Sequence, residues 1–132
     1  MTEKELSKYY WLKREIVDLE SRIAELGSGL SATKYDNIKV SSSHLNSSIQ
    51  EKIASLKNML IEKRISALEE YIKIEKYIDG IEDSDIRLMF RLRFLDMKNY
   101  DEIGRKLSYH RTSVSIKIRE YIDSHNSHKN VR

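Results

Sequence analysis

The first apolar stripe of the chain recurs at alternating spacings of three and four residues. It comprises Tyr9, Leu12, Ile16, Leu19, Ile23 and Leu26. This a/d heptad pattern predicts a helix with one narrow apolar seam, which needs a partner helix. Thr2, with Glu5 three residues later, predicts a capping box that opens the helix. Gly27 and Gly29 predict its end.

A Ser-rich connector from residue 27 to 48 follows, with seven serines and only scattered apolar residues. A connector of this length is uncommon in a compact domain, so we expect a flexible loop, with short β structure in the segment NIKVS as the alternative.

A second and longer helix is then expected from about Asn46 to Asp79. Its heptad stripe consists of Ile49, Ile53, Leu56 and Leu60 and continues after a one-residue slip as Ile61, Ile65, Leu68 and Ile72.

The slip rotates the apolar stripe, so we expect the two halves of this second helix to face different neighbours. A last apolar cluster lies just before and after Gly80. We expect the C-terminal domain to pack against it. Gly80 is the predicted end of the helix. The cluster consists of Tyr71, Ile74, Tyr77, Ile78 and Ile81.

Three short apolar blocks separated by brief turns occupy residues 83–122. Asp83 or Ser84 suits the N-cap of the first block, which is apolar beyond what a surface helix needs and is expected to be buried on more than one side. Its apolar residues are Ile86, Leu88, Met89, Phe90, Leu92, Phe94 and Leu95. The second block holds Tyr100, Ile103, Gly104 and Leu107, and the third holds Val114, Ile118 and Tyr121 or Ile122. This order predicts a helix-turn-helix with a supporting helix in front.

Gly104 favours a close crossing of the two helices in this motif, because a longer side chain would hold them apart. If Val114 and Ile118 point inward, the N-terminal half of the last helix presents polar and basic residues outward. In the helix-turn-helix docking mode that half enters the major groove, where arginine can bond guanine and isoleucine can touch a thymine methyl group. Arg105 and Lys106 on the preceding helix are expected to meet phosphates. The candidate DNA-binding residues are Arg105, Lys106, His110, Arg111, Thr112, Ser115, Ile116 and Arg119.

Three segments carry a resemblance to region 4 of bacterial sigma factors. They are IRLMFRLRF from Ile86 to Phe94, YDEIGRKL from Tyr100 to Leu107, and RTSV from Arg111 to Val114. Together with the coiled-coil front half, the whole chain resembles the small ArpU/RinA-type late-transcription regulators of phages and prophages of Gram-positive bacteria. This resemblance implies promoter binding and activation of late operons.

The sequence departs from that motif at two positions. His110 stands where the motif usually has a capping Ser or Thr before the recognition helix. The apolar position after Val114 falls at Ile118 rather than one residue earlier, where Lys117 stands. Both departures bear on the rotation of the last helix, and so on which residues face the bases.

The formal net charge of +3 is unevenly distributed along the chain. Residues 1–86 hold 13 Lys and Arg against 16 Asp and Glu, whereas residues 87–132 hold 11 against 5. The basic excess therefore coincides with the predicted helix-turn-helix, as expected of a DNA-binding module beside a separate assembly surface. The alternative without a binding function is a solvated basic face on a small helical domain. Proline is absent, so nothing forces a break in a long helix.

An enzyme or a metal site is not expected. Cysteine is absent, which excludes disulfides, thiolate metal sites and cysteine nucleophiles. The chain lacks the carboxylate-histidine pattern of a catalytic zinc site, a glycine-rich phosphate loop and a nucleophile elbow. We therefore expect no cofactor. The only candidates for metal ligands or a catalytic base are His44, His110, His125 and His128.

The expected fold is all-α, with a long coiled-coil helical hairpin followed by a small three-helix domain. The hairpin covers residues 1–80 with its loop at 27–48, the helix-turn-helix domain covers 81–123, and a frayed polar tail covers 124–132. No apolar run long enough to span a membrane and no signal peptide is visible, so we expect a cytoplasmic protein of a bacterial host cell.

The expected function is that of a sequence-specific, double-stranded-DNA-binding transcription regulator, with RNA polymerase as a further partner. Assembly into a homodimer or a higher homo-oligomer is expected through the seams of the long helices. There are two alternatives. The chain could be a small terminase-like packaging subunit, or an adaptor that acts through the coiled coil without DNA. The operator sequence, the direction of regulation, and pairing within or between chains stay open. The candidate oligomerisation residues are Leu12, Ile16, Leu19, Ile23, Leu26, Ile53, Leu56 and Leu60.

Overall fold

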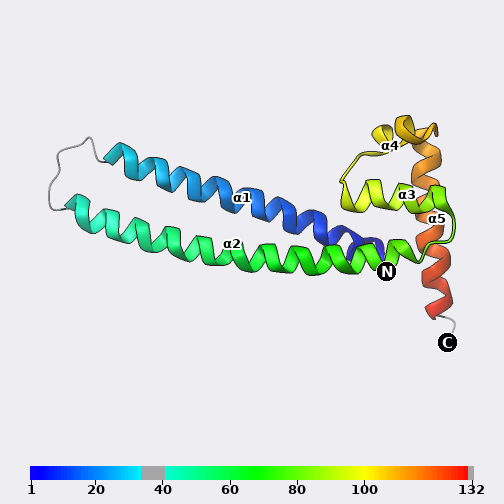
Figure 1. Ribbon diagram of the computed structural model, residues 1–132, viewed down its shortest axis with the longest axis horizontal. Helices are drawn as coiled ribbons and strands as arrows, with labels where there is room; N and C mark the ends of the chain where they lie inside the picture. The colour runs from blue at the N-terminus through cyan, green and yellow to red at the C-terminus, as the bar shows by residue number, and fades with distance from the viewer. Residues whose placement is uncertain (34–40, 131–132) are drawn as a thin grey trace. The chain divides into compact units, whose positions relative to one another are not determined.

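The computed structural model describes the backbone of residues 1–33 and 41–130, and the side chains of residues 1–28 and 45–126. All regular secondary structure in these residues is helical, which confirms the all-α fold (Figure 1). Two compact units share the long helices: Leu12–Ala67 is one, and Met1–Trp11 with Leu68–Arg132 is the other. The elements are α1 (Glu3–Thr33), α2 (Ser41–Asp79), α3 (Ser84–Phe90), η1 (Arg91–Leu95), α4 (Tyr100–Leu107) and α5 (Arg111–Asn130).

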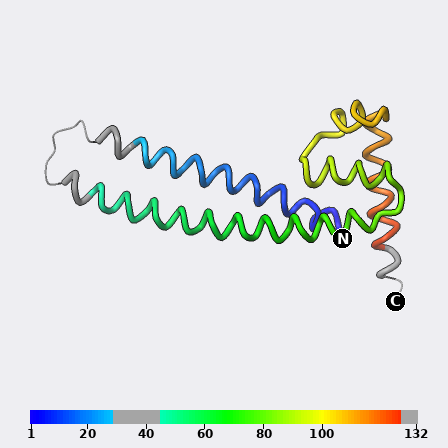
Figure 2. Tube along the Cα trace, in the orientation of Figure 1, coloured from blue at the N-terminus to red at the C-terminus, as the bar shows by residue number. Residues whose placement is uncertain are grey.

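In the unit Leu12–Ala67, α1 and α2 form an antiparallel helical hairpin (Figure 2). The heptad seam faces inward and buries Ile16, Leu19 and Leu60 to 8% exposure or less. Two ion pairs flank the seam. Lys63 Nζ lies 2.6 Å from Glu15 Oε2, and Arg64 Nη2 lies 3.2 Å from Glu20 Oε1. The predicted helical hairpin is therefore present, and its seam closes within one chain.

Both long helices extend further than the sequence predicts. Helix α1 runs through Gly27 and ends at Thr33, and α2 begins at Ser41 rather than at about Asn46. A glycine inside a helix costs only about 1 kcal/mol relative to alanine, and without proline nothing forces a break. The predicted connector 27–48 is therefore too long. The expectations of a flexible loop and of β structure in NIKVS otherwise concern residues 34–40, which lie outside the described residues.

The predicted one-residue slip in α2 is wrong. After Leu60, the buried face continues on the same register through Ala67, at 4% exposure, and Glu70, at 7%. A small residue and a paired carboxylate fill these positions, because Glu70 lies 3.4 Å from Lys8 Nζ and 3.5 Å from Lys73 Nζ. The apolar residues of the predicted second half-stripe are exposed instead: Ile61, Ile65, Leu68 and Ile72.

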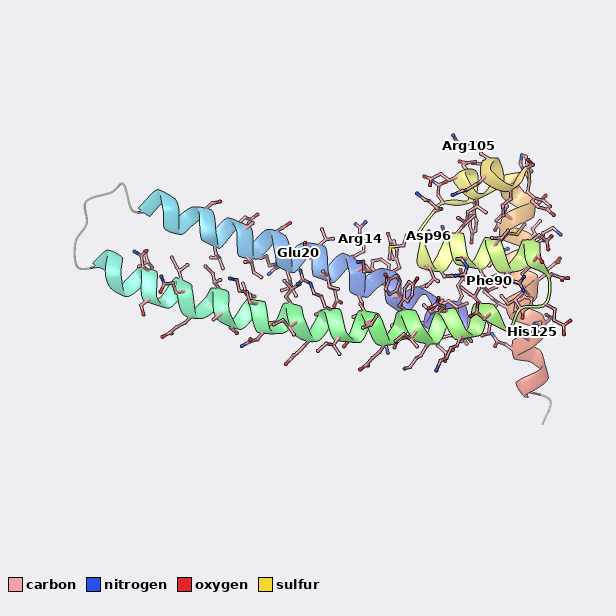
Figure 3. The ribbon with its side chains drawn as sticks, viewed as in Figure 1. Arg14, Glu20, Phe90, Asp96, Arg105 and His125 are labelled. Atoms are coloured by element: carbon pink, nitrogen blue, oxygen red, sulfur yellow. The ribbon has the colours of Figure 1, made fainter. Side chains whose placement is uncertain are left out.

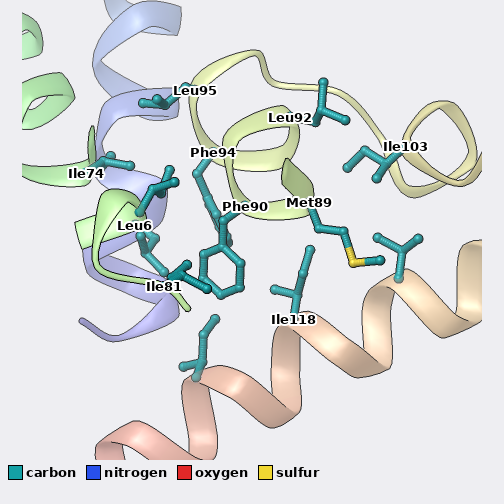
Figure 4. Packing of buried hydrophobic residues seen from close by; sticks show 13 residues of the cluster. Leu6, Ile74, Ile81, Met89, Phe90, Leu92, Phe94, Leu95, Ile103 and Ile118 are labelled. Carbon is teal, nitrogen blue, oxygen red and sulfur yellow. The ribbon is translucent and has the colours of Figure 1, made fainter. Parts of the chain in front are cut away.

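The second unit has one apolar core, with Phe90 at its centre (Figure 4). The predicted cluster at the end of α2 is part of it, and α2 ends at Asp79, directly before Gly80, as predicted. The first turns of α1 contribute the fully buried Leu6, so this unit is larger than the predicted domain 81–123. The buried core residues are Leu6, Ile74, Ile78, Ile81, Met89, Phe90, Leu92, Phe94, Leu95, Ile103, Val114, Ile118 and Ile122.

The N-terminal capping box of α1 is confirmed. The amide of Glu5 donates to Thr2 Oγ1 at 3.2 Å, and the amide of Thr2 donates to Glu5 Oε2 at 3.0 Å. At the other end of the chain, the part of the predicted frayed tail up to Asn130 is helical, because α5 continues to that residue, and residues 131 and 132 lie outside the described part. This segment contains neither glycine nor proline to stop a helix. Asn126 Nδ2 also donates to the Met1 carbonyl oxygen at 3.3 Å.

The supporting helix α3 continues into the π-helical turn η1, which the sequence pattern does not predict. Asp83 occupies the N-cap position without a side-chain capping bond. The chain reverses at Met97, where φ is 58°, and the Lys98 amide bonds the Leu92 carbonyl at 2.9 Å. Burial on more than one side is confirmed for most of the block, but Leu88 is 46% exposed.

Candidate nucleic-acid interface

Helix α4 begins with a reciprocal cap. Asn99 Oδ1 accepts from the Glu102 amide at 2.9 Å, and Asn99 Nδ2 donates to Glu102 Oε1 at 3.2 Å. This pattern fixes the first turn of α4 in the way that an Asx N-cap usually does. At the other end, Ser108 adopts the left-handed conformation with φ 61°, which ends the helix. The turn to α5 therefore starts at a defined residue.

The turn backbone lies directly against Gly104. The Tyr109 amide donates to the Gly104 carbonyl at 2.8 Å, and a Cβ atom on Gly104 would overlap the Tyr109 carbonyl oxygen. The same Cβ would lie 3.3 Å from the Arg111 amide nitrogen. The predicted need for a small residue here is confirmed. The atoms that leave no room are backbone atoms of the turn and of Arg111, the first residue of α5.

His110 performs the capping role that the helix-turn-helix motif usually gives to Ser or Thr. The Thr112 amide donates to His110 Nδ1 at 3.3 Å, and the Val114 amide donates to the His110 carbonyl at 3.1 Å. An imidazole nitrogen two residues before the amide acts here as a side-chain oxygen would. The first departure from the motif therefore preserves the start of α5.

The predicted orientation of α5 is confirmed. Val114 is fully buried and Ile118 is 2% exposed, whereas Ile116 is 44% exposed. Lys117, at the second position that departs from the motif, is half-buried, with its ammonium 5.6 Å from the centre of the Tyr109 ring. One face of α5 is thus committed to the core, and Lys117 packs against the turn.

The candidate DNA-binding side chains are accessible, with one exception. Ser115 is only half-exposed. On α4, Arg105 points away from the core of its unit (Figure 3). At 3.6 residues per turn, Thr112, Ile116 and Arg119 share one face of α5. The exposed candidates are Arg105, Lys106, His110, Arg111, Thr112, Ile116 and Arg119.

Arg111 and Ser115 lie at the flank of that face, next to the start of α4. Together with Thr112 they line a hollow of about 410 Å³ whose other wall comes from residues 99–101. Arg111 Nη1 lies 3.8 Å from Asp101 Oδ2. Sequence reasoning missed Asp101 and the Asn99 cap, because the apolar spacing of α4 carries no sign of how its first turn meets α5.

The turn is also fixed to the supporting helix. Tyr109 donates its hydroxyl to Asp85 Oδ2 at 3.0 Å, and Asp85 Oδ1 accepts from the Ile86 amide at 3.0 Å. The bond from Tyr109 is the main cause that lowers the pKa of Asp85, and the Asp85 carboxylate raises the pKa of Tyr109 in return. This contact holds α3 and the turn before α5 together.

The candidate oligomerisation residues all lie on the inner, seam face of the hairpin in the unit Leu12–Ala67. Within one chain, they face the other helix of the same hairpin. A role in joining separate chains stays a prediction. The half-buried members are Leu12, Ile23, Leu26, Ile53 and Leu56, and the buried members are Ile16, Leu19 and Leu60.

Neither a metal cluster nor a membrane-spanning helix is found among the described residues. No group of three or more metal-ligating side chains occurs among the described residues, and the side chains of His44 and His128 lie outside them. Within the same residues, every helix is too short or too polar to cross a bilayer. Comparisons with protein-family models, with curated proteins and with solved structures give no match. The function therefore has to be judged from the chain's own residues.

Proposed function

We propose that this chain is a sequence-specific, double-stranded-DNA-binding transcription regulator with α5 as its recognition helix. The observation that carries the proposal is the division of α5 into two faces. Val114 and Ile118 are buried, while Thr112 and Ile116 are exposed on the opposite face near the N-terminal half of the helix. A helix anchored by one face and exposed at its N-terminal half is what docking in the major groove requires.

The exposed side chains suit two kinds of contact. On α5, the Arg119 guanidinium can bond the O6 and N7 atoms of guanine, Thr112 can bond a base or a phosphate, and Ile116 can touch a thymine methyl group. On α4, Arg105 and Lys106 can bond phosphates, which positions the protein without reading sequence. We infer that base reading resides on α5 and phosphate binding on the end of α4.

The charge distribution supports the same proposal. Residues 87–132 carry 11 Lys and Arg against 5 Asp and Glu, although the whole chain is only +3. Binding to a polyanion through such a segment releases counterions, so the affinity should fall steeply as salt increases. The proposed mode of action is binding without catalysis, as a late-gene activator in the cytoplasm of a bacterial host, with RNA polymerase as a partner.

Selection of genomic fragments with the purified chain tests the proposal, followed by affinity measurements on the selected duplex and on a random one. Arg119→Ala should cost about 1–3 kcal/mol on the selected duplex and far less on the random one. Arg105→Ala should weaken both duplexes alike and reduce the salt slope by about 1. Lys52→Ala, at an exposed position of α2, is the control and should change neither affinity.

Three outcomes would contradict the proposal. Equal losses on both duplexes for Arg119→Ala would remove α5 from base reading. Undetectable binding to any duplex at low salt, together with a stable protein partner, would identify an adaptor. A ring-sized assembly in light scattering would favour a terminase-like packaging subunit.

A further inference from the structure

Helix α2 carries an apolar stripe that stays exposed in the described part of the chain. Ile61, Ile65, Leu68 and Ile72 are 53%, 54%, 60% and 44% exposed. Their spacings of four, three and four residues put them on one side of one continuous helix. At about 100° per residue, this stripe lies roughly 140° around the helix from the buried face. Single exposed apolar residues are ordinary, but four in helical register form a seam.

The residue types at the centre of this seam are those of a two-stranded coiled coil. With Ile65 and Ile72 at a positions, Ile61 and Leu68 fall at d positions, and Asn58 falls at the preceding a position. Isoleucine at a with leucine at d, as at Ile65 and Leu68, favours two parallel strands, whereas Ile61 at d departs from that pattern; a single asparagine at a, here Asn58, fixes register and oligomeric state. Asn58 is also exposed.

Charges beside the seam decide the orientation of a second copy. Lys57 and Arg64 fall at g positions, and Glu62 and Glu69 fall at e positions, all of them exposed. In a parallel pair each g residue faces the e residue five positions later in the other chain. Lys57 then meets Glu62 of the second copy, and Arg64 meets Glu69. An antiparallel pair would set Glu62 against Glu69 of the second copy, which repels.

One of these four residues already has a partner. Arg64 Nη2 lies 3.2 Å from Glu20 of its own chain, with both side chains about half exposed. The guanidinium has five N–H donors, so it can bond Glu20 and a second carboxylate together. Lys57 and Glu62 therefore provide the simpler test of the charge pattern.

We propose that a second copy of this chain binds to the α2 stripe and forms a parallel, in-register coiled coil centred on Ile65 and Leu68. The helix is already folded in the hairpin, so association does not have to order it, and a seam of about two heptads can suffice. This interface differs from the hairpin seam and does not depend on the proposed function. It would bring two copies of α5 into one assembly.

Sedimentation velocity of the full chain, without DNA, tests the dimer. The native chain should dimerise, and the double variant Ile65→Ser with Leu68→Ser should be monomeric at the same concentration. Val17→Ser, at a 61% exposed position on α1, is the matched control and should remain dimeric. Circular dichroism checks that helix content is unchanged, which is expected because all three positions are exposed. A monomeric native chain, or an equally dimeric double variant, would overturn the proposal.

Cross-linking tests the parallel register, because the native chain has no cysteine. Asn58→Cys should form an intermolecular disulfide under mild oxidation, since the two copies of residue 58 face each other only in a parallel pair. In the antiparallel pair that sets residue 65 against residue 68 they would be about 25 Å apart. Ser66→Cys, an exposed position one residue outside the seam, should cross-link far less. Equal cross-linking of both variants would refute the register.

Exchanging the charges at Lys57 and Glu62 tests the proposed parallel pairing directly. Glu62→Lys alone and Lys57→Glu alone should each weaken the dimer, and an equimolar mixture of the two variants should restore it as a heterodimer. No recovery in the mixture would contradict the parallel pairing. Because each of these measurements omits DNA, failure of the dimer would leave the proposed function untouched.

Discussion

Tyr109 donates its phenolic hydroxyl to the carboxylate of Asp85 at 3.0 Å and so joins the turn before α5 to the first turn of α3. The two residues are 24 positions apart in the sequence. The bond lowers the pKa of Asp85 and raises that of Tyr109, because it favours the charged carboxylate and the neutral phenol. The position of α5 therefore depends in part on an ionised carboxylate.

Tyr109→Phe should make the protein more sensitive to acid. Because the folded-state pKa of Asp85 is lowered, its stabilising contribution is present above the unfolded pKa and is lost as pH falls through the folded one. Without the Tyr109 hydroxyl, the midpoint of acid unfolding should move to higher pH, which circular dichroism can follow. Tyr100→Phe is the control, since the Tyr100 ring packs 4.2 Å from the Arg93 guanidinium without needing its hydroxyl. Identical midpoints for the native chain and Tyr109→Phe would contradict this role.

Alanine at two glycine positions should have opposite effects on stability. Gly104→Ala should lower the free energy of unfolding by about 1–3 kcal/mol, because the new methyl group would overlap the Tyr109 carbonyl. Gly27→Ala should raise it by about 0.5–1 kcal/mol, because Gly27 lies inside α1 and its Cβ would meet nothing within 4 Å. Urea unfolding measures both. A neutral Gly104→Ala would show that the turn can move away.

Local rules of helix formation explain what could be predicted from the sequence. The Thr2 and Glu5 box, the stop at Gly80 and the burial of Val114 and Ile118 each depend on residues within one or two turns. Such signals need no knowledge of the tertiary structure. This is why the sequence alone predicts the all-α fold and the two faces of α5.

Features that depend on contacts between distant residues cannot be predicted from the local sequence pattern. The register of α2 was missed because Ala67 and Glu70 occupy buried positions that a count of large apolar residues cannot recognise. Glu70 is tolerated there through lysines, one of them 62 residues earlier in the chain. Likewise, the apolar spacing carries no sign that the Arg111 guanidinium lies 3.8 Å from the Asp101 carboxylate at the start of α4.

Tyr77→Phe should not destabilise the protein and should improve its tolerance of alkali. The Tyr77 hydroxyl is buried without a hydrogen-bond partner among the described residues, and burial raises its pKa from 10.0 to about 12. A raised folded-state pKa stabilises below the unfolded value and loses that contribution as pH rises through the folded value. Phenylalanine keeps the ring contacts and removes the unpaired hydroxyl, so stability at neutral pH should be equal or about 1 kcal/mol higher.

Urea unfolding of Tyr77→Phe and the native chain at neutral pH and between pH 10 and 12 measures both parts of this prediction. The difference between the two proteins cancels the ionisation of the other tyrosines except Tyr121, whose charge interacts with Tyr77. A variant that is less stable at neutral pH would mean that the hydroxyl is paired in solution.

Asp101→Asn should tighten DNA binding while leaving stability nearly unchanged. Asp101 and Arg111 are 53% and 66% exposed in their side chains, and their atoms lie 3.8 Å apart, so this ion pair contributes little to folding. On the proposed function, however, Asp101 both competes with the duplex for Arg111 and repels phosphates. Removal of its charge should raise the affinity for duplex DNA about 3- to 10-fold at low salt, as fluorescence anisotropy can measure.

The same substitution in an Arg111→Ala background separates the two effects. A gain in affinity that disappears there comes from the release of Arg111, whereas a gain that persists comes from reduced repulsion of the phosphates alone. Weaker binding by Asp101→Asn would instead mean that Asp101 holds Arg111 in the orientation that binding needs.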